Sequence, residues 1–225
     1  MKRLTAALPW MAALSAAITI AAAEGLLAAG LPFIFKPLTT ALVIAWAWPR
    51  GAEWPLLRRW VITGLVLSLL GDVALLWPQQ GFLPGLVAFL LAHLAYIRAF
   101  AVPARFAAPP RWFVLYGVVA ALVLTQLWPG VPGALAAPVL VYVACLASMA
   151  AQAAVWWRTS VGADGAAHAR RAALGGLLFM ASDSLLAFDK FAAPLPLSAL
   201  WILAIYWTAQ WCIACALKAP SPTSP

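Results

Sequence analysis

The sequence predicts an all-α, polytopic membrane protein, and three observations lead to that fold class. First, 66% of the 225 residues are hydrophobic, only 9% are charged, and the mean hydropathy is +0.96. A chain of this composition has too little polar surface to cover a water-soluble globule. Second, apolar segments of about 20 residues, the length that crosses a bilayer, recur along the chain. Third, the basic residues are concentrated in every second connection between these segments.

Breaks at Pro, Gly and Arg divide the chain into eight predicted transmembrane helices. They cover residues 9–30, 33–48, 57–77, 82–101, 112–128, 134–157, 170–190 and 196–217. The connections are short, so residues 1–219 are predicted to form one membrane domain, followed by a short disordered tail at 220–225. The first segment also fits a cleaved signal peptide, with a basic start and small residues before Glu24. We expect it to be retained as a helix.

The basic residues support both the number of helices and their orientation. They are Lys2 and Arg3 before the first helix, Arg50, Arg58 and Arg59 after the second, Arg98, Arg105 and Arg111 after the fourth, Arg158, Arg170 and Arg171 after the sixth, and Lys218 after the eighth. The remaining connections, such as PQQG and PGVPG, carry almost no charge. By the positive-inside rule both termini are predicted to be cytoplasmic, as in a bacterial inner-membrane protein. The net charge of +8 is not gathered in one patch, so nucleic acid is not an expected partner.

A few polar and ionisable side chains lie inside the predicted helices. Such groups are costly within a bilayer, and they usually face the bundle interior and serve a function. At about 1.5 Å per residue, Asp72 and Asp183 both lie roughly 20 Å from the basic ends of their helices, and His93 lies slightly deeper. The candidate site residues are Lys36, Asp72, His93, Tyr96, Ser182, Asp183, Tyr206 and Gln210.

A short internal repeat suggests that the chain consists of two parallel four-helix halves. GDVALL (71–76) resembles SDSLLA (182–187), and AHLAYI (92–97) resembles AQWCIA (209–214), with offsets of 111 and 117 residues. Both members of each pair run in the same direction across the membrane. The repeat predicts that Asp72 and Asp183 face each other across a pseudo-twofold axis.

Five motifs in order resemble the YhhN-type lysoplasmalogenase family of polytopic membrane hydrolases. They are KPLTT (36–40), GD (71–72), AHLAY (92–96), GGLLFMASDSLLAFDKF (175–191) and YWTAQ (206–210). The resemblance implies hydrolysis of the vinyl ether bond of a lysoplasmalogen to a fatty aldehyde and glycerophospho-ethanolamine or -choline. It also implies that the partners are the lysophospholipid substrate and membrane lipids.

The chemistry of a vinyl ether gives the carboxylates a role. Hydrolysis needs an acid that protonates a carbon atom and a negative group that stabilises the resulting oxocarbenium ion, and two nearby carboxyls can share one proton. We therefore predict Asp72 and Asp183 as a catalytic pair in which either is the acid, and expect that replacing either by Asn abolishes turnover without unfolding. His93 and Gln210 would orient water or the ether oxygen, and Lys36 would bind the phosphate. Tyr96, Ser182 and Tyr206 complete the predicted substrate-binding set, and no cofactor is expected.

Several alternatives remain open at this point. A zinc hydrolase needs about three ligands, which His93 and the two aspartates could supply. A proton-coupled transporter would also place carboxylates between parallel repeats, with Pro37 breaking the second helix. A structural membrane module is a further alternative. Serine catalysis is disfavoured because G-x-S-x-G is absent, and the C-x-x-C of Cys212 and Cys215 lies in an apolar helix without a redox context.

Overall fold

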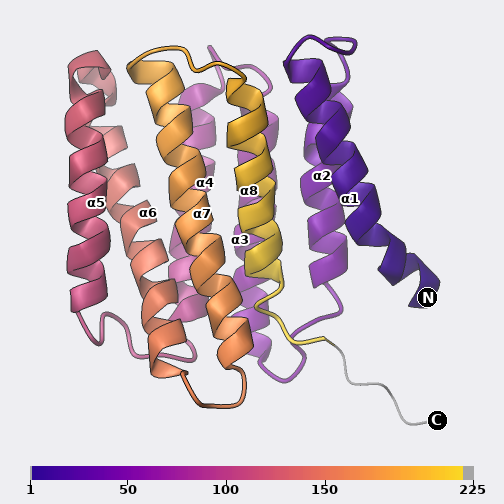
Figure 1. Ribbon diagram of the computed structural model, residues 1–225, viewed down its shortest axis with the longest axis vertical. Coiled ribbons are helices and arrows are strands. Elements are labelled where there is room, and N and C mark those ends of the chain that lie inside the picture. Colours follow the sequence, from indigo (N-terminus) through magenta and orange to yellow (C-terminus); the bar gives the residue numbers. More distant parts are fainter. Residues whose placement is uncertain (1, 220–225) are drawn as a thin grey trace.

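The chain folds into one bundle of helices that run up and down beside one another (Figure 1). The computed structural model describes residues 2–219, so the predicted tail at 220–225 lies outside the described residues. This part of the chain contains eight α-helices and one short 3-10 helix, without strands. The helices are α1 (Lys2–Ala23), α2 (Pro32–Ala47), α3 (Pro55–Ala74), α4 (Phe82–Phe100), α5 (Arg111–Leu127), η1 (Trp128–Gly130), α6 (Gly133–Thr159), α7 (Ala166–Phe191) and α8 (Ser198–Ala214).

The eight helices correspond to the eight predicted segments, and most of their ends differ from the prediction by only a few residues. The largest differences are at α1, which starts at Lys2 rather than at residue 9 and stops at Ala23 rather than at residue 30. Gly25 has a φ of +78°, a conformation that ends a helix and that glycine adopts without strain. In a similar way α7 starts at Ala166, earlier than predicted, directly after Gly165 with a φ of +96°.

Five of the helices, α1, α4, α5 (with η1), α6 and α7, are long and apolar enough to cross a membrane. Helices α2 and α8 are apolar but shorter, with 16 and 17 residues. Helix α3 has 20 residues and carries Arg58, Arg59 and Asp72. Large apolar side chains are exposed on the outside, as on α5, where Val114 is 64% exposed and Leu122 is 63% exposed. An apolar exterior of this kind suits lipid rather than water, and the protein is an integral membrane protein.

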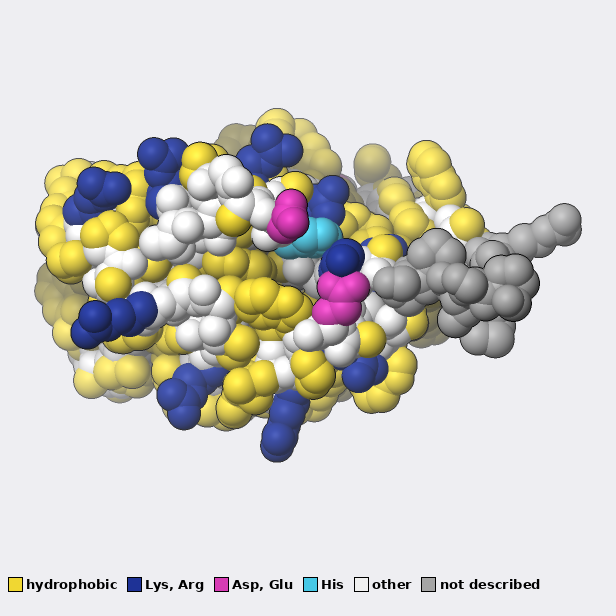
Figure 2. Space-filling model, turned by 90° about the horizontal axis from the view of Figure 1, so that it is seen from below, with side chains coloured by type: hydrophobic (Ala, Val, Ile, Leu, Met, Phe, Trp, Pro, Cys, Tyr) yellow, Lys and Arg dark blue, Asp and Glu magenta, His cyan; other side chains and the backbone are white. Residues whose placement is uncertain are grey.

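Most of the basic residues gather at one end of the bundle, which is the end at the bottom of Figure 1 (Figure 2). The connections after α2, α4 and α6 lie there together with the end of α8. Lys218, just beyond α8, pairs with Glu53 at 2.9 Å, and its carbonyl accepts a hydrogen bond from the Gly51 amide at 2.9 Å. The two contacts fix the end of α8 to the connection between α2 and α3.

Small residues allow the central helices to pack closely. A Cβ atom on Gly64 of α3 would lie 2.3 Å from the ring of Tyr96 on α4, and one on Gly71 would lie 2.5 Å from the ring of Phe89. On α7, a Cβ on Gly175 would lie 2.7 Å from Ile213 of α8. Together with Gly64 and Gly71, Ser68 and Asp72 form a small and polar face of α3 that is buried. This close packing brings the polar residues of neighbouring helices together.

Candidate active site

Asp72 lies at the end of a chain of hydrogen bonds in the bundle interior. Its side chain is almost fully buried, and its Oδ2 accepts hydrogen bonds from Thr40 Oγ1 of α2 at 2.6 Å and from the Tyr206 hydroxyl of α8 at 2.8 Å. Gln210 Nε2 donates to the Tyr206 oxygen at 3.1 Å, and the Tyr96 hydroxyl donates to Gln210 Oε1 at 2.7 Å. This group thus joins four helices, α2, α3, α4 and α8, around one carboxylate.

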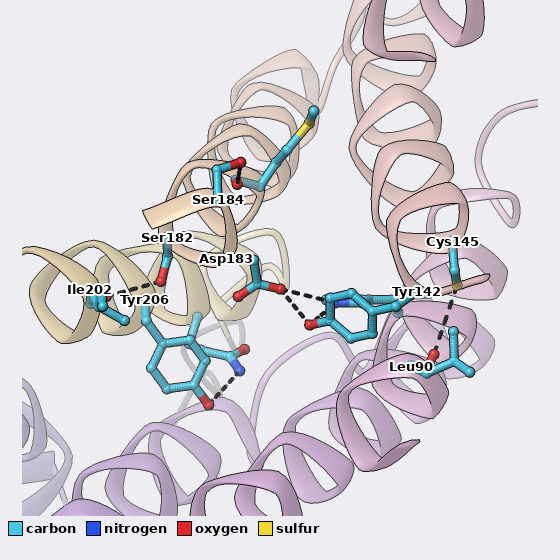
Figure 3. A network of polar contacts seen from close by, with 11 residues as sticks. Leu90, Tyr142, Cys145, Ser182, Asp183, Ser184, Ile202 and Tyr206 are labelled. Carbon is cyan, nitrogen blue, oxygen red and sulfur yellow. Dashed lines mark hydrogen bonds and ion pairs between the residues drawn. The ribbon is translucent and has the colours of Figure 1, made fainter. Parts of the chain in front are cut away.

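Asp183 lies in a second polar group, formed with Tyr142 of α6 and His93 of α4 (Figure 3). The Tyr142 hydroxyl donates a hydrogen bond to Asp183 Oδ2. His93 Nε2 lies 3.1 Å from the Tyr142 oxygen and 3.6 Å from Asp183 Oδ2. The other ring nitrogen of His93, Nδ1, is buried and has no hydrogen-bond partner among residues 2–219. His93 is therefore held through Nε2, on the side that faces Asp183.

The two aspartates differ in whether they line a cleft of the bundle. The side chain of Asp183 is 12% exposed and lies on the wall of a partly open cleft between α4, α5, α6 and α7, which has a cavity volume of about 80 Å³. Apart from Asp183, Tyr142, Ser184 and Lys190, the residues that line this cleft are apolar. Asp72 does not line it. The cleft therefore gives a lipid-like molecule access to Asp183 and not to Asp72.

An aromatic side chain connects the two polar groups. The ring of Phe179 lies 4.7 Å from the ring of His93 and 5.4 Å from that of Tyr206. The prediction that Asp72 and Asp183 hold one proton jointly requires a direct hydrogen bond between the carboxyls. No such bond joins them in the described part of the chain, because each carboxylate accepts its hydrogen bonds from hydroxyl groups instead. The two carboxylates therefore belong to separate hydrogen-bonded groups, and their joint action on one proton stays a prediction.

Six of the eight predicted site residues lie in these two groups, and two do not. Lys36 is half-buried on α2, one turn before Thr40, and does not line the cleft. Its predicted contact with a substrate phosphate has no support in the cleft geometry. Ser182 is buried, and its hydroxyl donates to the Ile202 carbonyl of α8 at 3.0 Å, so it connects α7 and α8 and points away from Asp183 (Figure 3).

Sequence reasoning missed Tyr142 and Thr40, both of which bind an aspartate directly. Tyr142 is in α6, a segment whose composition looks like apolar filler, although a hydroxyl at that depth could have been noticed. Thr40 is the last residue of the KPLTT motif. It also accepts a hydrogen bond from Trp207 Nε1 at 3.1 Å, so α8 contacts the Asp72 group twice.

Among the described residues, no three His, Cys, Asp or Glu side chains come close enough to hold a metal ion together. His93 and Asp183 are neighbours, but Asp72 is bound by Thr40 and Tyr206 in the other polar group. The two-aspartate ligand set considered for a zinc hydrolase is therefore not assembled.

The fold and the site define the class of this protein: a helical integral membrane protein with a carboxylate on the wall of an apolar cleft. Residues 31–217 match the sequence model of the YhhN family, so the chain belongs to this family. It is 36% identical over 179 residues to the human lysoplasmalogenase TMEM86B, and the match covers 77% of this chain and 69% of the human protein.

Two further relatives come from distant organisms. The bovine lysoplasmalogenase TMEM86A is 35% identical over 161 residues, which cover 68% of this chain and 63% of the bovine protein. A lysoplasmalogenase of Mycobacterium tuberculosis is 36% identical over 152 residues, which cover 64% of this chain and 53% of that protein. The chain thus matches less than two thirds of the length of these two relatives. No solved structure matches this chain.

Proposed function

We propose that this protein is a lysoplasmalogenase, a membrane hydrolase that cleaves the vinyl ether bond of a single-chain plasmalogen. The products are a fatty aldehyde and glycerophospho-ethanolamine or -choline. Membership of the YhhN family and relatives named lysoplasmalogenases support the proposal. The observation that carries it is the position of Asp183, a carboxyl on the wall of an apolar cleft that is open on one side.

In the first step Asp183, in its protonated form, gives its proton to the β-carbon of the vinyl ether. The π electrons of the double bond form the new C–H bond, and the carbon attached to oxygen becomes an oxocarbenium ion. Asp183 is then a carboxylate next to this cation. In an apolar cleft a fixed negative charge stabilises a developing positive charge far more than in water.

In the second step a water molecule adds to the oxocarbenium carbon and gives one proton to the Asp183 carboxylate. This step restores the acid and forms a hemiacetal. The hemiacetal breaks its bond to the glycerol oxygen, which takes the hydroxyl proton, and the aldehyde is released. Tyr142 holds Asp183 Oδ2 throughout, which leaves Oδ1 without a bond to another described residue and directs it at the reacting atoms.

Asp72 has a different proposed role, that of a positioning residue. It binds Thr40 of α2 and Tyr206 of α8, and the ring of Tyr206 packs 5.4 Å from that of Phe179, which in turn packs against His93. The contacts of Asp72 therefore fix Tyr206, which packs against Phe179, and Phe179 in turn fixes the ring of His93. We propose that Tyr96 and Gln210 belong to this support rather than to the surface that binds substrate.

The proposed topology has eight membrane-spanning helices in two parallel halves, α1–α4 and α5–α8. The hydrogen bonds of the two aspartates support it. Asp72 is bound by α2 of its own half and by α8, the last helix of the other half, whereas Asp183 is contacted by α6 of its own half and by α4, the last helix of the other. Each half thus contributes its last helix to the aspartate of the other half, as is expected of duplicated halves. The basic end would face the cytoplasm of a bacterial cell.

The test uses purified protein in detergent with a lysoplasmalogen and its 1-acyl ester analogue, each with and without a chelator. We expect aldehyde release from the vinyl ether, no fatty acid from the ester, and no effect of the chelator. Loss of activity with the chelator, restored by metal, would overturn the metal-free mechanism. In liposomes, uptake of the lipid without bond cleavage would overturn the proposal in favour of transport.

A further inference from the structure

Lys190 lies at the rim of the cleft whose wall carries Asp183. It is exposed near the end of α7, and its Nζ is 4.0 Å from the ring centroid of Phe82 on α4 and 5.9 Å from that of Phe191. The two rings hold the ammonium group by cation–π contacts. A positive charge is therefore fixed at the entrance of an apolar cleft.

This cation has no carboxylate partner in the part of the chain that the structure describes. Neither of the ion pairs formed in residues 2–219 includes Lys190. Its neighbour Asp189 uses Oδ1 to accept a hydrogen bond from the Leu195 amide at 2.8 Å, so it caps the connection between α7 and α8. The connections in and around which the arginines occur are at the opposite end of the bundle (Figure 1). An anionic group at the rim would therefore bind the Lys190 ammonium group without displacing an ion pair.

The spacing of Lys190 and Asp183 on α7 suits the polar part of a lysophospholipid. They are seven positions apart, which is two helical turns or about 10 Å, and both residues line the cleft. In a lysoplasmalogen the glycerol backbone separates the phosphate from the vinyl ether by a similar length. The order also fits a lipid in a membrane, because the headgroup lies at the surface and the chain points toward the middle.

We propose that Lys190 binds the phosphate of the single-chain phospholipid and so places the vinyl ether at Asp183. The chain continues past Asp183 along the apolar wall formed by α5 and α6. Lys190 thus takes the role that the sequence analysis gave to Lys36, which does not line the cleft. The identity of the bond that is cleaved rests on the proposed function, but binding of the phosphate at Lys190 does not.

A binding measurement with lipids that cannot be cleaved tests the role of Lys190 independently of catalysis. The probes are a saturated 1-O-alkyl lysophospholipid, which has no vinyl ether to protonate, and the matching 1-O-alkyl glycerol without phosphate. For Lys190→Gln we expect about tenfold weaker binding of the phosphate-containing probe and unchanged binding of the other, since one charge-assisted contact is lost. Lys190→Arg should restore most of the affinity. Lys218→Gln, at the opposite end, is the matched control and should bind both probes like the unaltered protein.

Kinetics on the lysoplasmalogen give a second measurement. Lys190→Gln should raise KM about tenfold, with a smaller effect on kcat, because the acid and its partners are intact. If Lys190→Gln binds both probes as the unaltered protein does, the inference about Lys190 is wrong, whatever the activity. If the probes discriminate as expected but no aldehyde is formed by any variant, the lysoplasmalogenase proposal fails and the phosphate site stands.

Discussion

At the scale of single residues, what a carboxylate faces determines what it can do. Asp72 and Asp183 occur in similar sequence motifs and at similar positions in their helices. Asp72 is enclosed by hydroxyl donors, whereas Asp183 is open to the cleft. The two aspartates should therefore respond differently to the same substitution.

Replacing Asp183 by Asn should reduce kcat by roughly 10²- to 10⁴-fold, since the amide cannot act as the general acid. Asp72→Asn should lower kcat less than tenfold and the free energy of unfolding by about 1–3 kcal/mol, because two buried hydroxyls lose their charged acceptor. Aldehyde release and thermal unfolding in detergent measure the two effects. Asp164→Asn, in the exposed connection before α7, is the control. Equal losses of kcat in the two variants would contradict the division of roles.

The hydroxyl of Tyr142 should matter for the reaction more than for the fold. Tyr142→Phe keeps the ring but removes the donor to Asp183 and the partner of His93 Nε2. We expect kcat to fall about 10- to 100-fold with little change in KM, because the acid is no longer held in one orientation. Tyr116→Phe on α5 is a matched control. An unchanged kcat for Tyr142→Phe would show that the Tyr142 hydroxyl has no role in the reaction.

At the scale of the helices, glycines on α3 determine how closely α4 approaches. The ring of Tyr96 occupies the space that a side chain on Gly64 would need, and Tyr96 also binds Gln210 of α8. The same close contact therefore sets both the distance between α3 and α4 and the hydrogen bonds next to Asp72.

Gly64→Ala should lower the free energy of unfolding by about 1–3 kcal/mol, since a methyl group there overlaps the Tyr96 ring. Gly117→Ala on α5, where no atom lies within 4 Å of the new methyl group, should be neutral or slightly stabilising. Thermal unfolding of the purified variants in detergent measures both. If the two substitutions have the same effect, close packing of α3 and α4 does not limit stability.

The helices and the two aspartates could be predicted from the sequence, because apolar segments and an ionisable group within them are conspicuous. The end of α1 could not, since a positive φ at Gly25 depends on the connection that follows. The contact of Ser182 with the Ile202 carbonyl of α8 could not be predicted from its place next to Asp183, because consecutive helical residues point about 100° apart. Tyr142 was missed because an aromatic residue in an apolar helix resembles ordinary packing. Whether a carboxylate is open or enclosed depends on the rings around it, which come from other helices.

At the scale of the whole molecule, the charge asymmetry predicts which end of the bundle faces the cytoplasm. In a background with Cys145, Cys212 and Cys215 replaced by Ala, Gln79→Cys introduces a thiol between α3 and α4, and Asp164→Cys introduces one between α6 and α7. In intact cells a membrane-impermeant thiol reagent should label the first and not the second, because the basic connections stay inside. The reverse labelling pattern would invert the proposed topology.

The position of the cleft next to α5 determines where the two products of lipid cleavage would leave the protein. Helix α5 lies at the edge of the bundle (Figure 1), and its cleft-facing side chains Val123, Leu124 and Leu127 are aliphatic. A long-chain aldehyde released against them would escape sideways among the surrounding acyl tails, while the water-soluble glycerophosphodiester would depart past Lys190. One bond cleavage would thereby deliver its products to two different phases, and a reactive carbonyl compound would never have to cross open water.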